Sequence, residues 1–251
     1  MIRWMWAFLD RPLPRFERAA EFWCAVSDTD LSPRRGDEGE FATFLPRDAT
    51  ADACLTVQGV REGGGAHIDL DVEDVASATR AAVEEHSASL VRQDGPDLSV
   101  LRTPGGQLFC FTQWAGHVRR PPVVEHADGS TSRVDQVTFD ISPEHFDREA
   151  AFWSGLTGWE LRPSKAAEFV RLEVPGELPL HILLQRLDTP GPAGAHIDVA
   201  CSSGVDRIRV LHEGFGASKA ADGKGWHVMR DPAGGVYCLT PRDPRTGRVP
   251  N

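Results

Sequence analysis

Two short stretches of the sequence place the same reactive residue types side by side. The letters "AHID" occur at residues 66–69 and again at 195–198, so His67 and His196 each stand two residues before an aspartate. In a β-strand such residues point to the same side. Asp69 and Asp198 could therefore orient the imidazoles, raise their basicity, or share a metal ion with them. We interpret the aspartates mainly as residues that orient their histidines.

A cysteine follows each histidine–aspartate pair at a similar distance. Cys110 lies in "QLFCFT" and Cys238 in "GVYCLT", each flanked by apolar residues in a predicted strand. This setting favours a small buried side chain over a nucleophile. The five cysteines of the chain contain no CxxC pair, which excludes a four-cysteine zinc site and predicts reduced thiols in a cytoplasmic protein.

The histidines belong to a longer internal repeat. "RAAEFWCAV" pairs with "REAAFWSGL", "GEFATF" with "AEFVRL", and "TPGGQLFCFT" with "DPAGGVYCLT", always about 128 residues apart. Landmarks that keep their order over the whole chain indicate a duplication. We predict a first domain at residues 1–115, a linker at 116–132, a second domain at 133–242 and a tail at 243–251, the linker being polar and rich in Pro and Gly.

Each copy shows the same succession of hydrophobic patterns. A strand, an amphipathic helix and two or three short strands follow one another twice per copy, which predicts an α+β chain of four βαβββ modules. In the second copy Ser142 and Pro143 suggest the start of a helix and Gly158 its end. Strand alternation places three aromatic side chains on one face of the first strand, namely Trp4, Trp6 and Phe8.

Composition limits the function classes. The chain has 251 residues, 41% hydrophobic and 25% charged, and a net charge of −10. With no basic cluster to offset that charge, nucleic acid is an unlikely partner. The apolar start before Asp10 is too short for a signal peptide or a membrane span. We expect a monomer or homodimer that binds a small molecule.

The repeated motifs resemble the vicinal oxygen chelate superfamily, in particular its two-domain glyoxalase-like proteins of the bleomycin-resistance and dioxygenase type. The similarity rests on "FW" in the first helix of each copy, on "AHID", and on the hairpins "PGGQLFC" and "PAGGVYC". It covers residues from about Arg3 to Thr240. The resemblance implies two tandem glyoxalase-like domains with concave mixed sheets, whose concave face binds a ligand, often through a divalent metal.

The resemblance also implies where metal ligands would fall. Relatives that use metal place a ligand in the first strand, one at the end of the first module, a histidine opening the second module and a glutamate in the final strand. In this chain only the third position keeps its histidine in both copies, as His67 and His196. The first position holds Trp6 in one copy and Gln136 in the other, the second holds Gln58 and Gln185, and the fourth holds Cys110 and Cys238 in place of glutamate. The first copy therefore lacks the usual ligand set. If Ni, Zn or Fe binds, we expect it at Gln136, His196 and Cys238.

Three function classes follow from these observations. The missing carboxylates and the aromatic wall favour a small-molecule binder that uses neither a metal nor another cofactor, with Thr138 among the cleft-facing polar residues. The alternative is a metal-dependent lyase, isomerase or dioxygenase of glyoxalase type that works in the second domain. A scaffold protein is the third class, and no heptad or basic stripe supports it.

Overall fold

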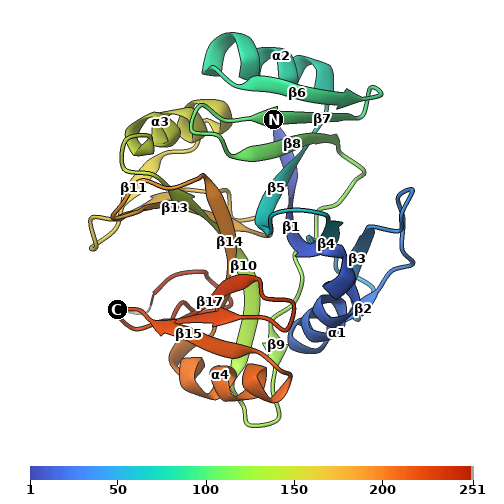
Figure 1. The fold of residues 1–251 in the computed structure, drawn as a ribbon, viewed down its shortest axis with the longest axis vertical. Coiled ribbons are helices and arrows are strands. Elements are labelled where there is room, and N and C mark those ends of the chain that lie inside the picture. The colour runs from blue at the N-terminus through green and yellow to red at the C-terminus, as the bar shows by residue number, and fades with distance from the viewer. Residues whose placement is uncertain (250–251) are drawn as a thin grey trace. The chain divides into compact units, whose positions relative to one another are not determined.

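The computed structural model describes residues 1–249 and contains two mixed β-sheets with a few helices (Figure 1). This confirms the predicted α+β class. The first sheet is built from the first copy and has the order β2–β3–β4–β1–β5–β8–β7–β6. Its strands are β1 (Ile2–Pro12), β2 (Thr29–Leu31), β3 (Phe41–Pro46), β4 (Leu55–Val60), β5 (Gly65–Val72), β6 (Ser89–Asp94), β7 (Leu98–Arg102) and β8 (Leu108–Gln113).

The second sheet repeats this order with the strands of the second copy, β11–β12–β13–β10–β14–β17–β16–β15, and the short β9 pairs with β10. In both sheets the strand that opens the second module runs parallel to the last one, β5 to β8 and β14 to β17. The strands are β9 (Val124–Glu125), β10 (Thr131–Ile141), β11 (Leu161–Pro163), β12 (Phe169–Leu172), β13 (His181–Arg186), β14 (Gly194–Ala200), β15 (Ser218–Asp222), β16 (His227–Arg230) and β17 (Val236–Thr240).

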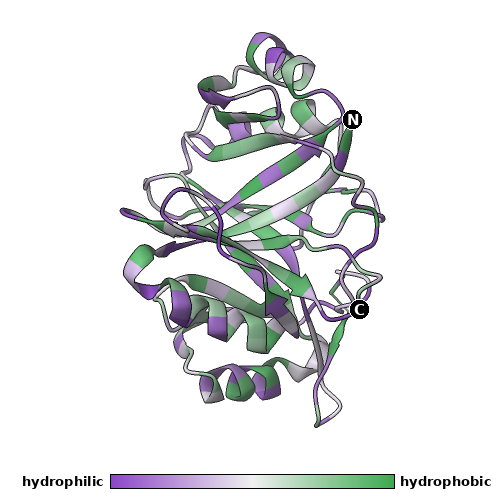
Figure 2. Ribbon diagram, turned by 90° about the vertical axis from the view of Figure 1, so that its right-hand side faces the viewer, coloured by the Kyte–Doolittle hydropathy of each residue, from purple (hydrophilic) through white to green (hydrophobic). Residues whose placement is uncertain are grey.

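The helices are four α-helices and two short 3₁₀ turns within residues 1–249. They are η1 (Leu13–Arg15), α1 (Phe16–Ser27), α2 (Val75–His86), α3 (Phe146–Thr157), η2 (Ser202–Gly204) and α4 (Val205–Gly214). Figure 2 shows that each helix carries both hydrophobic and hydrophilic residues, as expected when one side packs on a sheet.

The chain divides into two compact units that do not follow the two sequence copies. Unit 1 comprises residues 1–7, 67–118 and 137–195, and unit 2 comprises residues 8–66, 119–136 and 196–249 of the described chain. Each unit therefore combines one module from the first copy with one module from the second.

The core of unit 1 joins aromatic residues of both copies. Phe109 on β8 packs against Phe152 and Trp153 of α3, at ring-centroid distances of 5.8 and 5.4 Å. Trp153 also stacks on Phe139 of β10 at 4.7 Å. The "FW" pair of the second copy thus fills the core beneath its own strand and beneath a strand of the first copy.

The core of unit 2 is built in the same way from α1 and β17. Phe22 and Trp23 of α1 contact Tyr237 of β17, with centroid distances of 5.9 and 5.0 Å. His212 of α4 is fully buried in this group and hydrogen-bonds the Tyr237 hydroxyl through Nδ1 at 3.0 Å. A polar pair is therefore enclosed among these aromatic rings.

Two local expectations need correction. The helix expected to begin at Ser142 and Pro143 begins only at Phe146. Residues 142–145 form a separate turn instead, closed by a hydrogen bond from the His145 N–H to the Ser142 carbonyl. Gly158 ends the helix as expected, with a φ of 72°. Strand β5 is also more buried than simple alternation implies. Asp69 and Asp71 are only 6% and 2% exposed, so both are buried together with Leu70 between them.

Candidate functional site

The first cluster lies in unit 1, where β5 and β8 run side by side. Parallel pairing places Asp69 directly beside Cys110, and the spacing along β5 places His67 next to Asp69, with 3.7 Å between Nε2 and Oδ1. One ligand atom from each of the three side chains lies within 4.8 Å of the other two. Imidazole nitrogen, carboxylate oxygen and sulfur are thus brought together.

A second carboxylate, Asp71, lies further along β5. Its oxygens accept hydrogen bonds from the Thr112 hydroxyl at 2.6 Å and from the Trp6 indole N–H at 3.2 Å, and His117 lies 3.6 Å away. Burial raises the pKa of Asp71, and these hydrogen bonds oppose the rise. The Trp6 ring meets His117 edge-on at 5.0 Å, so an aromatic surface borders a polar one.

The second cluster lies in unit 2 and has the same three residue types. Asp198 pairs with Cys238 across β14 and β17. His196 Nε2 lies 3.3 Å from Asp198 Oδ1 and 3.6 Å from Cys238 Sγ. All three side chains are buried, and their ligand atoms also lie within 4.8 Å of one another.

Asp198 stands in a network of charged and amide donors. The Gln136 amide and the Arg242 guanidinium both approach its Oδ2 atom, Arg242 at 3.5 Å. Arg242 forms a further buried ion pair with Asp135. One oxygen of the carboxylate, Oδ2, is therefore held by donors, and the other, Oδ1, lies next to His196.

The other predicted site residues are distributed over both units. Trp6 and Phe8 are partly exposed, whereas Trp4 and Thr138 are buried. Gln58, on β4, belongs to unit 2, and Gln185, on β13, belongs to unit 1. Their roles toward a ligand remain predictions.

Sequence reasoning missed three residues that shape the clusters: His117, Asp135 and Arg242. Asp71 shares a face with Asp69, as strand alternation predicts. Asp135 and Arg242 are far apart in the chain, so only the folded structure reveals their ion pair.

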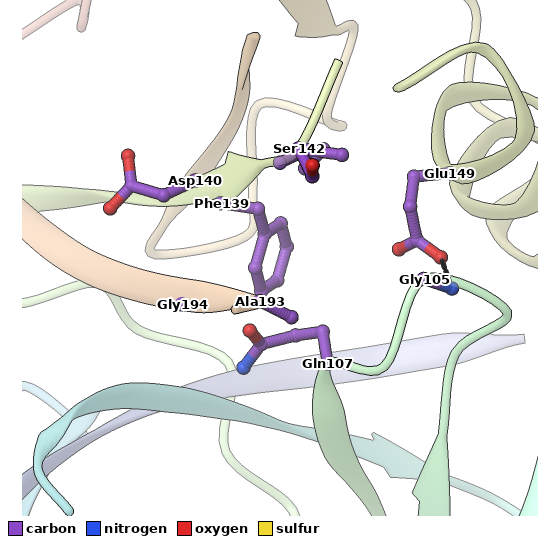
Figure 3. Close-up of a pocket in the computed structure, with 9 residues that line it drawn as sticks. Gly105, Gln107, Phe139, Asp140, Ser142, Glu149, Ala193 and Gly194 are labelled. Carbon is purple, nitrogen blue, oxygen red and sulfur yellow. Dashed lines mark hydrogen bonds between the residues drawn. The ribbon is translucent and has the colours of Figure 1, made fainter. Parts of the chain in front are cut away.

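A small pocket lies elsewhere in unit 1, at the start of α3 (Figure 3). Glu149 points toward the loop before β8 and accepts a hydrogen bond from the Gly105 N–H. Phe139, Asp140 and Gln107 also line this pocket. Burial raises the pKa of Glu149. The carboxylate ties a loop to a helix, which is a structural task.

The donor sets of the two clusters differ in how well they suit a divalent metal. Nitrogen, sulfur and carboxylate ligands together are suited to zinc, iron or nickel. In the second cluster the positive charge of Arg242 next to Asp198 opposes a cation. In the first copy Trp114 occupies the corresponding place, four residues after the cysteine. At the expected metal position, Gln136, His196 and Cys238, a cation would therefore lie close to the positive charge of Arg242.

The strand order, the duplicated modules and the clusters opening each second module define a protein with two tandem glyoxalase-like domains. The family model described as "Glyoxalase-like domain" matches twice, at residues 6–112 and 136–240. The chain therefore belongs to the glyoxalase-like domain family, and the expected membership of the vicinal oxygen chelate superfamily is confirmed.

Several solved structures with a similar fold are dioxygenases of low sequence identity to this chain. The 2,3-dioxygenase LapB from Pseudomonas sp. KL28 is 13% identical, with a TM-score of 0.61 over 93% of this chain and 90% of its own. The 2,2',3-trihydroxybiphenyl 1,2-dioxygenase from Sphingomonas wittichii strain RW1 is 13% identical, with a TM-score of 0.61 over 95% and 90%. No curated protein sequence matches the chain. No helix within residues 1–249 has the length and apolar character needed to cross a membrane.

Proposed function

We propose that this protein binds a small, partly aromatic organic molecule and does so without the metal centre usual in its superfamily. The observation that carries this proposal is the set of contacts around Asp198. An amide donor and a guanidinium already approach Oδ2 of this carboxylate, and Oδ1 lies 3.3 Å from His196 Nε2. A neutral or anionic ligand group can use such donors, whereas a divalent cation would be repelled by Arg242.

The aromatic part of the ligand is inferred from unit 1. Trp6 is partly exposed and its ring borders His117, while its N–H is fixed by Asp71. An indole held in one orientation beside polar groups is suited to stacking on a flat ring whose substituents form hydrogen bonds. His67, Asp69 and Cys110 are the polar candidates of this copy, and Gln136, His196, Asp198 and Cys238 those of the other.

Binding can be tested by titrating the whole protein with aromatic compounds and following tryptophan fluorescence. A set of neutral phenols and aromatic carboxylates should include compounds that quench the signal saturably at one or two sites per chain. The proposal fails if no compound in the set binds by fluorescence or by calorimetry. We further infer a cytoplasmic monomer or homodimer, in keeping with cysteines that form no disulfide within residues 1–249.

A metal-dependent lyase, isomerase or dioxygenase is the second candidate. It is favoured by the two clusters, since His196, Asp198 and Cys238 in the second domain, or His67, Asp69 and Cys110 in the first, could hold an ion that acts as a Lewis acid. Several solved structures with a similar fold are dioxygenases, which supports this candidate by analogy of fold alone. Reconstitution with nickel, zinc or ferrous iron, followed by assays of metal content and turnover, separates this candidate from the first.

A further inference from the structure

The aromatic border of the first cluster contains a histidine whose chemistry the proposed function does not use. His117 lies in the loop after β8, and its ring packs against two indoles of β1, with centroid distances of 6.0 Å to Trp4 and 5.0 Å to Trp6. Its backbone carbonyl accepts a hydrogen bond from the Trp114 indole N–H at 3.0 Å. All four residues belong to unit 1. Contacts with three tryptophans therefore fix the position of this imidazole.

The two ring nitrogens of His117 have different surroundings. Nδ1 is buried and faces Oδ2 of Asp71 at 3.6 Å, with no hydrogen-bond partner at shorter range within residues 1–249. The side chain as a whole is 27% exposed, and Nε2 is neither enclosed nor hydrogen-bonded within the same residues. A proton on Nδ1 points at the carboxylate, which leaves the lone pair on the open nitrogen, Nε2.

Asp71 is held in place to face this imidazole. It is 2% exposed, its Oδ1 accepts a hydrogen bond from the Thr112 hydroxyl at 2.6 Å, and its Oδ2 accepts one from the Trp6 N–H at 3.2 Å. Both donors are neutral, so they orient the carboxylate without balancing its charge. A proton gained by His117 would supply the missing positive charge.

Other charged groups on the neighbouring strands are engaged elsewhere. The Arg3 guanidinium of β1 lies over the Trp114 ring at 4.4 Å and 3.6 Å from Glu73. Asp69, the preceding carboxylate on β5, lies next to His67. The charge of a protonated His117 is therefore matched by Asp71.

The second copy has no counterpart of this pair. The repeat places Ala200 at the position of Asp71 and Arg245 at that of His117, seven residues after the cysteine in each copy. Only the hydroxyl of Thr112 is retained, as Thr240. The pair is therefore a property of the first copy and no part of the duplicated framework.

We propose that His117, positioned by Asp71, accepts the proton of a weakly acidic hydroxyl group on the aromatic ligand that Trp6 binds. This inference rests on the proposed function and gives the ligand its class, a phenol. The ligand O–H bond breaks, its proton moves to Nε2, and the imidazolium with its Nδ1–H toward Asp71 lies beside the phenolate. An imidazole oriented through one nitrogen and open at the other is suited to this role.

The absorbance of 4-nitrophenol reports the proton transfer, because the phenol and its phenolate absorb at different wavelengths. The compound is titrated with pH in the presence of saturating full-length protein, before and after dialysis of the protein against EDTA. We expect the bound compound to ionise at least about one pH unit below the free compound, which is a tenfold gain in ionisation. 4-Nitroanisole has the same ring but no O–H, so it should quench tryptophan fluorescence without any spectral response to pH.

Three variants assign the effect to the pair. His117→Gln can still donate a hydrogen bond to Asp71 but cannot take up the proton, so the bound compound should ionise like the free one. Asp71→Asn should give an intermediate shift, because it removes the matching negative charge. His86→Gln, at a partly exposed histidine of the same unit, should keep the full shift. If His117→Gln does not fold, as judged by circular dichroism, His117→Asn takes its place.

The possible results separate this inference from the proposed function. An ionisation midpoint that is lowered in the wild type and restored in His117→Gln supports the proton acceptor. Binding of both compounds with an unchanged midpoint, or a lowered midpoint kept in His117→Gln, overturns this inference alone. A shift that disappears after dialysis against EDTA would assign the ionisation to a metal ion and overturn it as well. If neither compound binds, and no other phenol or aromatic carboxylate does, the proposed function fails and this inference fails with it.

Discussion

At the scale of single residues, the two copies use one motif in different surroundings. His67 and His196 both lie next to an aspartate on their own strand and next to a cysteine on the adjacent strand. Trp6 and Asp71 border the first group, whereas Gln136, Arg242 and Asp135 border the second. Duplication therefore preserved the cluster while its neighbours diverged in charge.

Trp6 provides the residue-level test of ligand binding. Trp6→Ala should weaken an aromatic ligand by roughly 1–3 kcal/mol through loss of the stacking surface. Trp6→Phe keeps a ring but loses the N–H that binds Asp71, so we expect a smaller loss. Calorimetric titration of both variants measures the effect. Unchanged affinity together with reduced stability would show that Trp6 only fills space.

The sequence predicted the contents of each cluster but not its electrostatics. Strand spacing alone places His196 beside Asp198, and the duplicated hairpin identifies Cys238 as the third member. Arg242 and Asp135 escaped prediction because their contact depends on how distant strands come together. Charge pairing of this kind has no local sequence pattern.

At the scale of elements, the hairpin before each final strand is fixed to a helix in a copy-specific way. In unit 2, Asp231 accepts hydrogen bonds from Arg11 Nε at 2.6 Å and from Trp23 Nε1 at 3.0 Å. In unit 1, Thr103 takes the place of Asp231, and the equivalent indole N–H, that of Trp153, is buried and has no hydrogen-bond acceptor among residues 1–249. Glu149 holds that hairpin instead.

Gly235 shows how tightly the Asp231 hairpin is packed. A Cβ at this position would lie 2.1 Å from Cζ and Nε of Arg11, which is 1% exposed and cannot move aside. Gly235→Ala should therefore lower the free energy of unfolding by about 1–3 kcal/mol. Gly214→Ala, where the added Cβ meets nothing within 4 Å, should have little effect. Denaturant unfolding of both variants checks this, and equal stability of the two would contradict the packing argument.

The buried His212 of α4 makes the stability of the protein dependent on pH. Burial lowers its pKa to about 3, against an ordinary value of 6.5. Because the unfolded chain takes up this proton first, the stability that neutral His212 contributes is present above pH 6.5 and is lost as the pH falls toward 3.

His212→Gln keeps hydrogen-bonding capacity toward Tyr237 but cannot titrate. We expect its unfolding free energy to fall less than that of the wild type between pH 7 and pH 4. His86→Gln, at a partly exposed histidine, should follow the wild type. Chemical denaturation at several pH values provides the measurement. If the unfolding free energies of wild type and His212→Gln change in parallel with pH, His212 does not contribute to the pH dependence of stability.

Hydrophobic periodicity identified the helices and the strand pattern, but it placed one helix start too early. Ser142 and Pro143 suit a helix start, yet here they form a preceding turn, and α3 begins at Phe146. Local residue preferences are the same for both arrangements. The burial of Phe146 in the core decides between them.

At the scale of the whole molecule, the repeat in the sequence and the compact units in space differ. Each unit joins one module of each copy, and both cores contain contacts between copies, such as Phe109 with Trp153 and Arg11 with Asp231. We still propose the sequence boundaries 1–115, 116–132, 133–242 and 243–251 for the duplicated segments. We expect the chain to be cut at residues 116–132 and the two halves to stay together afterwards.

Limited proteolysis tests this distinction. The first cuts should fall within residues 116–132, where many side chains are exposed. The two fragments should then remain together in size-exclusion chromatography under native conditions and separate only in denaturant. Early cuts inside either copy would contradict the boundaries. Separation of the fragments without denaturant would contradict the shared cores.

Metal content is the measurement that tests the central claim most directly. Native mass spectrometry with elemental analysis should be applied to the purified protein after exposure to nickel, zinc and ferrous iron, alongside His67→Ala and His196→Ala. We predict no stoichiometric metal in any of the three, together with a small organic ligand that survives purification or can be added back. One metal ion per chain, lost in His67→Ala or in His196→Ala, would contradict the metal-free account and support the metal-dependent enzyme.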